Sequence, residues 1–235
     1  MLLRADGDGV IAIGQASHAW LSGQLARAWR PRPEPFEEVV LAATMHDVGM
    51  AMWDLAPALH PDTGLPRTFM EMDLAEHLRL WHAAPARVLT QSRWAALLVS
   101  LHGTRLYERR DLARMSDEDA DAARAYLASQ RVLQARLAEE LGAGDEQLRE
   151  LQRLIFTWDG LSLALCVPWD PFEIEGFRLA GERLSPWPFD GDALTVRCEG
   201  RRLEGRYGSE PELHAALEQG ERVALEFALR PGDEG

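Results

Sequence analysis

Residues 43–54 read "ATMHDVGMAMWD", and in this largely apolar stretch a histidine and an aspartate stand side by side. At helical spacing His46 shares a face with Val39 and Met50, so its imidazole is predicted to point into the protein. Burying a polar or ionised group without a partner costs free energy. The pair His46-Asp47 therefore predicts a site at which one helix offers a nitrogen and an oxygen to the same metal ion.

Three more segments place a polar residue on an apolar helical face, at His18, His102 and Asp159. A buried carboxylate needs a cation or good hydrogen-bond donors, and one shared metal ion would satisfy all of these groups. Taken singly, each residue has another interpretation. A histidine can be a hydrogen-bonded core residue, Asp159 can pair with a buried arginine, and His102 can serve as a cation at a helix C-terminus before Gly103.

The remaining pattern predicts a mainly α-helical protein. Apolar residues at helical spacing, with proline or glycine near the ends, indicate helices over residues 15–30, 35–51, 71–82, 86–103, 116–142 and 145–166. The "DGDG" turn at residues 6–9 predicts a short N-terminal β-hairpin, and glycine turns after Pro168 predict a small C-terminal antiparallel β part. We expect a helical domain over residues 1–167 with a β extension over residues 168–235 packed on it.

Composition narrows the classes of function. With 38 acidic and 25 basic residues the net charge is −13, which opposes general nucleic-acid binding and binding to anionic membranes. The chain has no lysine, so recognition of an anion falls to arginine. The two cysteines fit no metal or redox spacing. Neither a signal peptide nor an apolar run of about eighteen residues is visible, which predicts a cytoplasmic protein.

The order His18, then His46-Asp47, then Asp159 in "FTWDGLSLAL" resembles the metal-binding motif of the HD-domain phosphohydrolases. Residues 10–170 also resemble an uncharacterised bacterial family, a domain of unknown function. The HD resemblance implies an HD-domain-like helical bundle in which these four residues hold a divalent metal. The likeness to the uncharacterised family rests on "ASHAWLSGQLARAW", "ATMHDVGMAMWD", "GLPRTF", "WAALLVSLHG" and "WDGLSLALC".

The HD resemblance further implies hydrolysis of a phosphoester by metal-bound water, with Asp47 and His102 as catalytic residues. Some HD enzymes hold a second metal with histidines between the HD pair and the last aspartate, and His102 and His77 are the candidates here. The ion can be Mn, Fe, Ni, Co, Mg or Zn, as one ion or two. The lysine that many members carry beside the HD pair is missing, which leaves the substrate pocket unassigned.

A small phosphorylated molecule would need arginine near the site, and Arg67 and Arg105 are the candidates. The proline-rich loop over residues 54–69 begins soon after Asp47, so we expect it to border the opening and bring Arg67 or Asp54 near the metal.

Two other functions remain open. A non-catalytic metal- or ligand-binding module would close its site with protein ligands, whereas an enzyme needs a cleft at the HD pair. A di-iron oxygenase would use the same ligands together with His77 and His102. The helix over 116–142 could also support a homodimer, although its apolar face can equally fill the protein's own core; that face carries Tyr126, Leu133, Leu137 and Leu141.

Overall fold

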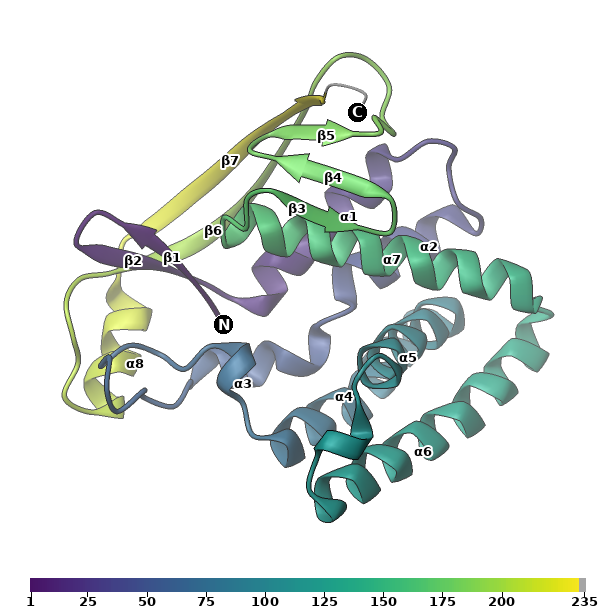
Figure 1. Cartoon of the computed structure of the whole chain (residues 1–235), viewed down its shortest axis with the longest axis horizontal. Helices are drawn as coiled ribbons and strands as arrows, with labels where there is room; N and C mark the ends of the chain where they lie inside the picture. The colour runs from purple at the N-terminus through teal and green to yellow at the C-terminus, as the bar shows by residue number, and fades with distance from the viewer. Residues whose placement is uncertain (233–235) are drawn as a thin grey trace.

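A computed structural model describes residues 1–232 of the chain (Figure 1). The α-helices are α1 Gln15–Ala28, α2 Phe36–Met45, α3 Ala51–Leu55, α4 Leu74–Leu89, α5 Arg93–Glu108, α6 Asp117–Leu141, α7 Asp145–Cys166 and α8 Glu210–Gln219. Short 3-10 helices are η1 Val48–Met50, η2 Phe69–Glu71 and η3 Leu112–Arg114. The strands are β1 Leu2–Asp6, β2 Gly9–Ile13, β3 Phe172–Ile174, β4 Phe177–Ala180, β5 Arg183–Ser185, β6 Leu194–Leu203 and β7 Arg222–Pro231.

The seven strands form one mixed sheet in the order β1-β2-β6-β7-β5-β4-β3. Neighbouring strands are antiparallel except β5 and β7, which run parallel. The N-terminal hairpin joins this sheet because Val10 pairs with Leu203 and Ala12 with Arg201. The sheet thus draws its strands from both of the expected domains.

The predicted fold class is therefore wrong. The protein is 55% helical and carries a seven-stranded mixed sheet, so it is not a mainly α HD-like bundle with a small hairpin and a minor antiparallel β part. The strands do lie in the two predicted regions, before residue 15 and after Pro168. What the pattern does not reveal is their pairing, because backbone hydrogen bonds between distant segments leave no period in the sequence.

Helix α1 covers the part of β6 that β2 leaves unpaired. The side-chain amide of Gln24 donates to the carbonyl of Arg197 at 2.8 Å and accepts from its N–H at 3.1 Å. The hydroxyl of Ser17 donates to the carbonyl of Glu199 at 2.6 Å. These bonds satisfy backbone groups that a strand edge would otherwise expose, and they fix α1 on the sheet.

Helix α7 lies beside α1 on the same layer, between the sheet and the helices α4, α5 and α6 (Figure 1). Arg4 of β1 reaches its C-terminus, where the guanidinium donates to the carbonyls of Leu165 at 2.7 Å and Cys166 at 3.2 Å. A cation at this end of a helix satisfies carbonyls that have no partner within the helix. The sheet thereby holds both helices of the middle layer.

Two helical predictions fail at their boundaries. Helix α4 continues through the buried Pro85 to Leu89 instead of ending at residue 82, because the ring packs in the core and only one backbone donor is lost. Helix α5 then begins after Ser92, whose hydroxyl accepts from the N–H of Ala95 at 3.2 Å. Helix α8, capped by Ser209, lies in a region for which only strands were predicted.

The apolar face of α6 is used inside the chain. Tyr126 and Leu137 are buried, and Leu137 packs with Ala96 and Leu97 of α5. This face therefore packs inside the chain, as the second interpretation of its pattern expects. Within residues 1–232, no helix combines the length and the apolar composition needed to cross a bilayer.

Gly49 permits the close crossing of η1 and α4. A Cβ at this position would lie 2.5 Å from the carbonyl oxygen of Leu80, which belongs to backbone and cannot rotate away. We predict that Gly49→Ala lowers the free energy of unfolding by about 1–3 kcal/mol, as overpacked cores do. Gly208→Ala is the control, since its Cβ would meet only the end of the flexible Glu212 side chain, at 3.3 Å. Equal urea midpoints for the two variants would contradict this account.

Candidate metal centre

The His46-Asp47 pair lies at a break between two helices rather than inside one. Helix α2 ends at Met45, and Asp47 has φ −96° and ψ 18°, a sparsely populated conformation in which active-site residues are often found. The predicted continuous helix over 35–51 is thus divided into α2, η1 and α3. The break turns the two adjacent side chains toward a common point, where a continuous helix would hold them about 100° apart.

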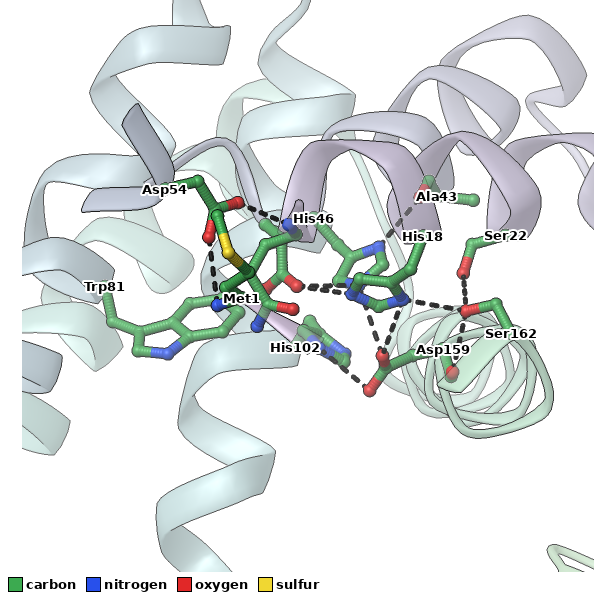
Figure 2. A network of polar contacts seen from close by, with 12 residues as sticks. Met1, His18, Ser22, Ala43, His46, Asp54, Trp81, His102, Asp159 and Ser162 are labelled. Carbon is green, nitrogen blue, oxygen red and sulfur yellow. Dashed lines mark hydrogen bonds and ion pairs between the residues drawn. The ribbon is translucent and has the colours of Figure 1, made fainter. Parts of the chain in front are cut away.

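Five of the six predicted metal ligands come together at this point. Oδ2 of Asp47 lies 2.6 Å from Nε2 of His18 and 3.6 Å from Nε2 of His46. The Asp159 carboxylate lies 3.2 Å from Nε2 of His46 and 3.5 Å from Nε2 of His102. The side chains of His18, His46, His102 and Asp159 point toward one another from α1, the end of α2, α5 and α7 (Figure 2). Among residues 1–232, these four residues and Asp47 form two sets with ligand spacing, which share His46: His18, His46 and Asp47, and His46, His102 and Asp159.

Ser162 fixes the ring of His18. The Ser162 hydroxyl donates its proton to the carbonyl of Asp159 at 2.8 Å, so it can only accept from Nδ1 of His18 at 2.9 Å and from Ser22 at 3.0 Å. Nδ1 of His18 therefore carries a proton. Its Nε2 lies 2.6 Å from Oδ2 of Asp47, so a proton or a metal ion has to lie between these two atoms. Metal-binding histidines are oriented in this way by a partner on the second nitrogen.

The ring of His46 is oriented in the same way, but by a hydrogen bond to a backbone carbonyl. Its Nδ1 lies 2.8 Å from the carbonyl of Ala43, an acceptor that requires a proton on that nitrogen. Its Nε2 is buried and close to both carboxylates, yet it makes no aligned hydrogen bond with either. Lone pairs of a ring nitrogen and of two carboxylates that face one another repel, so a cation has to lie between them. That cation can be a proton or a metal ion, and the donor set fits both.

The pKa values describe the same charge balance. Burial would lower the pKa of His46, but the carboxylates of Asp47 and Asp159 outweigh it and raise this pKa to about 9. Burial would raise the pKa of each carboxyl, but the neighbouring histidines hold both pKa values below their usual range. Burial lowers the pKa of His102 to about 4, so this ring is neutral at pH 7, as a metal ligand must be.

A cavity of about 390 Å³ reaches this centre from the surface. His18, Asp47, His102 and Asp159 line its inner end, whereas His46 is completely buried behind them. The cavity is otherwise bordered mainly by apolar side chains of η1, α4, α5, α7 and the η2 region. A small molecule in the cavity could therefore contact these side chains.

His77 lines the cavity but takes no part in either ligand set. The indole N–H of Trp81 donates to Nε2 of His77 at 3.1 Å, so Nδ1 of the neutral ring donates to the hydroxyl of Tyr107. Burial and the charge of Arg110 lower the pKa of His77 to about 4, which keeps the ring neutral. Both nitrogens are engaged, and His77 acts in this structure as a wall residue that positions Trp81 and Tyr107.

The loop after α3 lies mostly away from the cavity, beside α8 (Figure 1). Its backbone bonds to Tyr207 and His214, and Arg67 does not line the cavity. Only the end of the loop, at Phe69, borders the opening. Asp54 lies near the centre but pairs with the α-amino group of Met1 at 2.9 Å (Figure 2).

Arg105, the other predicted substrate-binding arginine, pairs with a carboxylate and does not line the cavity. Its guanidinium donates to Glu175 at 2.6 Å and lies over the ring of Phe156, outside the cavity lining. The arginine at the cavity is Arg110, whose guanidinium lies over the Tyr107 ring at 4.9 Å. Arg110 lies two residues after the end of α5 and beyond the helix predicted over residues 86–103, so helical spacing gave no signal for it.

Gln15 is a second polar lining residue that the sequence did not suggest. It is the first residue of α1, and its side-chain oxygen Oε1 is buried without a hydrogen-bond partner. An unpartnered acceptor of this kind costs free energy unless water or a ligand satisfies it. The sequence pattern gives no signal for Gln15. It is the first residue of its helix, so it does not interrupt an apolar helical face.

Comparison with known families places most of the chain in one of them. The family described as Protein of unknown function (DUF3891) matches residues 1–205, which extend from β1 beyond β6. No curated protein and no solved structure matched the chain. The predicted likeness to a domain of unknown function is thereby confirmed, whereas the HD-domain superfamily is not.

The charge states of the centre predict how stability depends on pH when metal is removed. The pKa of His46 is about 9 in the folded protein and 6.5 in the unfolded chain, so its contribution is complete below pH 6.5 and is lost as pH rises to 9. His77 and His102 have pKa values of about 4, so the unfolded chain takes up their protons first as pH falls from 6.5. The unfolding free energy should therefore peak near pH 6.5 and fall on each side by on the order of 1–3 kcal/mol.

Urea unfolding in a chelator at pH 4.5, 6.5 and 8.5 measures this profile. His77→Gln removes one of the groups that titrate on the acid side, so it should flatten that limb and leave the alkaline limb unchanged. Stability that rises steadily from the lowest to the highest pH would show that these charge states are wrong.

Proposed function

The chain belongs to the DUF3891 family, and from the geometry of its centre we propose that it is a metal-dependent phosphohydrolase acting on a small phosphorylated molecule in the cytoplasm. One observation carries the proposal: at the inner end of an open cavity, two oriented imidazoles direct Nε2 toward two buried carboxylates. The donors are nitrogen and oxygen without sulfur, which suits Mn, Fe, Ni, Co, Mg or Zn. The two ligand sets share His46, and only its Nε2 is free to bind a metal, so the geometry favours one ion bound between them.

A bound divalent ion would acidify a water molecule and polarise a phosphoryl oxygen. The protein's own residues supply the rest. Asp47 lines the cavity with a depressed pKa, so it stays ionised and can bind the ion and accept a hydrogen bond from its water. His102 is neutral and its Nε2 lies 3.5 Å from the Asp159 carboxylate, which suits this nitrogen to bind the ion. Arg110 offers a guanidinium at the cavity for the phosphate oxygens.

The order of the candidate metal ligands along the chain supports a phosphoester as the substrate. His18, His46-Asp47 and Asp159 follow one another as the metal ligands do in the HD-domain phosphohydrolases that they resemble. We carry over only this donor set and its chemistry, since the seven-stranded sheet is not part of that likeness.

The two rival functions have less support. A metal that only ties helices together would be closed off by protein ligands, whereas this centre opens into a cavity. A di-iron oxygenase would need His77 as a ligand, and both nitrogens of His77 already bond to Trp81 and Tyr107. The open phosphohydrolase site is therefore the function that we propose.

Metal content and hydrolysis test the proposal together. We predict that purified protein retains Mn, Fe, Ni, Co or Zn in elemental analysis, and that metal-loaded protein hydrolyses a chromogenic aryl phosphate. Asp159→Asn removes the carboxylate charge with little change of volume, so it should abolish metal retention and lower the rate roughly 100-fold or more. Asp192→Asn, at an exposed turn, is the matched control and should change neither value.

The two outcomes separate the two parts of the proposal. If Asp159→Asn retains metal as well as the unaltered protein does, the residues do not form a metal site. If metal is retained but no phosphoester is hydrolysed, the metal site stands and the hydrolase assignment fails.

A further inference from the structure

The cavity wall has a chemistry that the metal centre does not require. Beyond the metal ligands, most of the lining side chains are apolar, and they come from five separate segments. Three of them are methionines, whose unbranched side chains adapt to ligands of different shape. Together they make one side of the cavity suited to an apolar group. They are Met50, Phe69, Met70, Met72, Leu74, Trp81, Leu106 and Leu163.

Polar groups are few on the same wall. Apart from the metal ligands, the polar lining residues within the described part of the chain are Gln15, His77 and Arg110. Both nitrogens of His77 are engaged, which leaves one amide and one guanidinium for a ligand. A nucleobase or a sugar carries many donors and acceptors, and each one buried without a partner costs about 1–3 kcal/mol. The wall therefore discriminates against polar organic groups.

The exposed guanidinium of Arg110 lines the cavity and is available to an anion. Its guanidinium lies over the ring of Tyr107, and the Tyr107 hydroxyl is held by His77. Among the described residues no carboxylate forms an ion pair with Arg110 within 4.0 Å. The three residues thus present a positive charge beside the apolar wall.

We propose that the cavity selects phosphomonoesters whose organic group is a compact apolar aryl or alkyl group; this rests on the proposed phosphohydrolase function. The phosphate lies between the metal centre and Arg110, and the organic group lies against the methionine and leucine side chains. In the reaction the oxygen of a water molecule bonds to phosphorus and the ester P–O bond breaks. Inorganic phosphate and the alcohol or phenol leave, and the water supplies the proton that the alcohol takes up.

Two substrates of opposite polarity test the selectivity. With the full chain loaded with Mn²⁺, we expect kcat/KM for 1-naphthyl phosphate to exceed that for glycerol 1-phosphate by roughly 100-fold, since the naphthyl group buries apolar area that glycerol lacks. Equal values for the two substrates would overturn the selectivity and leave the phosphohydrolase standing.

A matched pair of exposed methionines tests the wall without disturbing the core. Met70 is 65% exposed and lines the cavity, whereas Met52 is 62% exposed and does not. Met70→Gln should raise KM for 1-naphthyl phosphate about 5- to 10-fold and leave glycerol 1-phosphate unchanged, because one apolar contact is worth about 1 kcal/mol. Met52→Gln should alter neither substrate. The same loss in both variants, or in neither, would contradict the assignment of the wall.

Binding of phosphonates, which cannot be hydrolysed, separates this inference from the proposed function. Calorimetry should show that Mn²⁺-loaded protein binds 1-naphthylphosphonate more tightly than methylphosphonate, and that Arg110→Met weakens both by about 10-fold. If the preference is present but no phosphoester is hydrolysed, the wall assignment holds and the phosphohydrolase fails. If neither phosphonate binds, the cavity does not take this class of ligand and the inference is overturned.

Discussion

Two carboxylates buried among helices have to be matched by positive charge, and much of this structure can be understood from that constraint. Asp47 and Asp159 come from distant parts of the chain and are almost fully enclosed. Desolvation alone would make both neutral, so their depressed pKa values depend on the three histidines that face them. A proton on His46 meets the requirement in the absence of metal, and a divalent ion meets it more completely. The helices α1, α2, α5 and α7 meet where this charge is placed.

The surrounding residues divide into those that orient the centre and those that shape its access. Ser162 and the carbonyl of Ala43 fix the proton on one nitrogen of His18 and His46. On the other side, the hydrogen bonds from Trp81 to His77 and from His77 to Tyr107 hold the wall of the cavity and the arginine above it. Ser162 and Ala43 thus set the direction of the ligand nitrogens. Trp81, His77 and Tyr107 shape the cavity through which a molecule reaches the centre. Substitutions in the two groups should therefore have separable effects on metal affinity and on ligand selection.

The residues that converge at the centre could be predicted from the sequence because each one interrupts a regular apolar stripe. His18, His46, His102 and Asp159 share that signal, and the neighbouring Asp47 adds to it. His77 shows why residue type is not sufficient. It also lies in the interval where a second metal would take its ligands, but its nitrogens are used by Trp81, one helical turn away, and by Tyr107 on another helix. A contact with another helix cannot be read from one helical face.

The sheet could not be predicted because its assembly depends on pairs such as Val10 with Leu203, which nothing local specifies. The break at His46 was equally hidden, since no proline or glycine lies between Met45 and Val48. Gly49, a few residues later, is needed for the approach to Leu80 and not for the break itself.

The pairing of β2 with β6 has a consequence for the order of events during synthesis. Helix α1 follows β2 directly and rests on β6, so the helix that carries His18 has its supporting surface only when residues near 200 have been made. Contacts between such distant segments carry a large loop-closure entropy and slow the search for the native state. On the ribosome, the acidic and histidine side chains of the centre would be present for most of translation without their final geometry. Nascent chains of this protein should therefore depend on protection from aggregation until the last strands emerge.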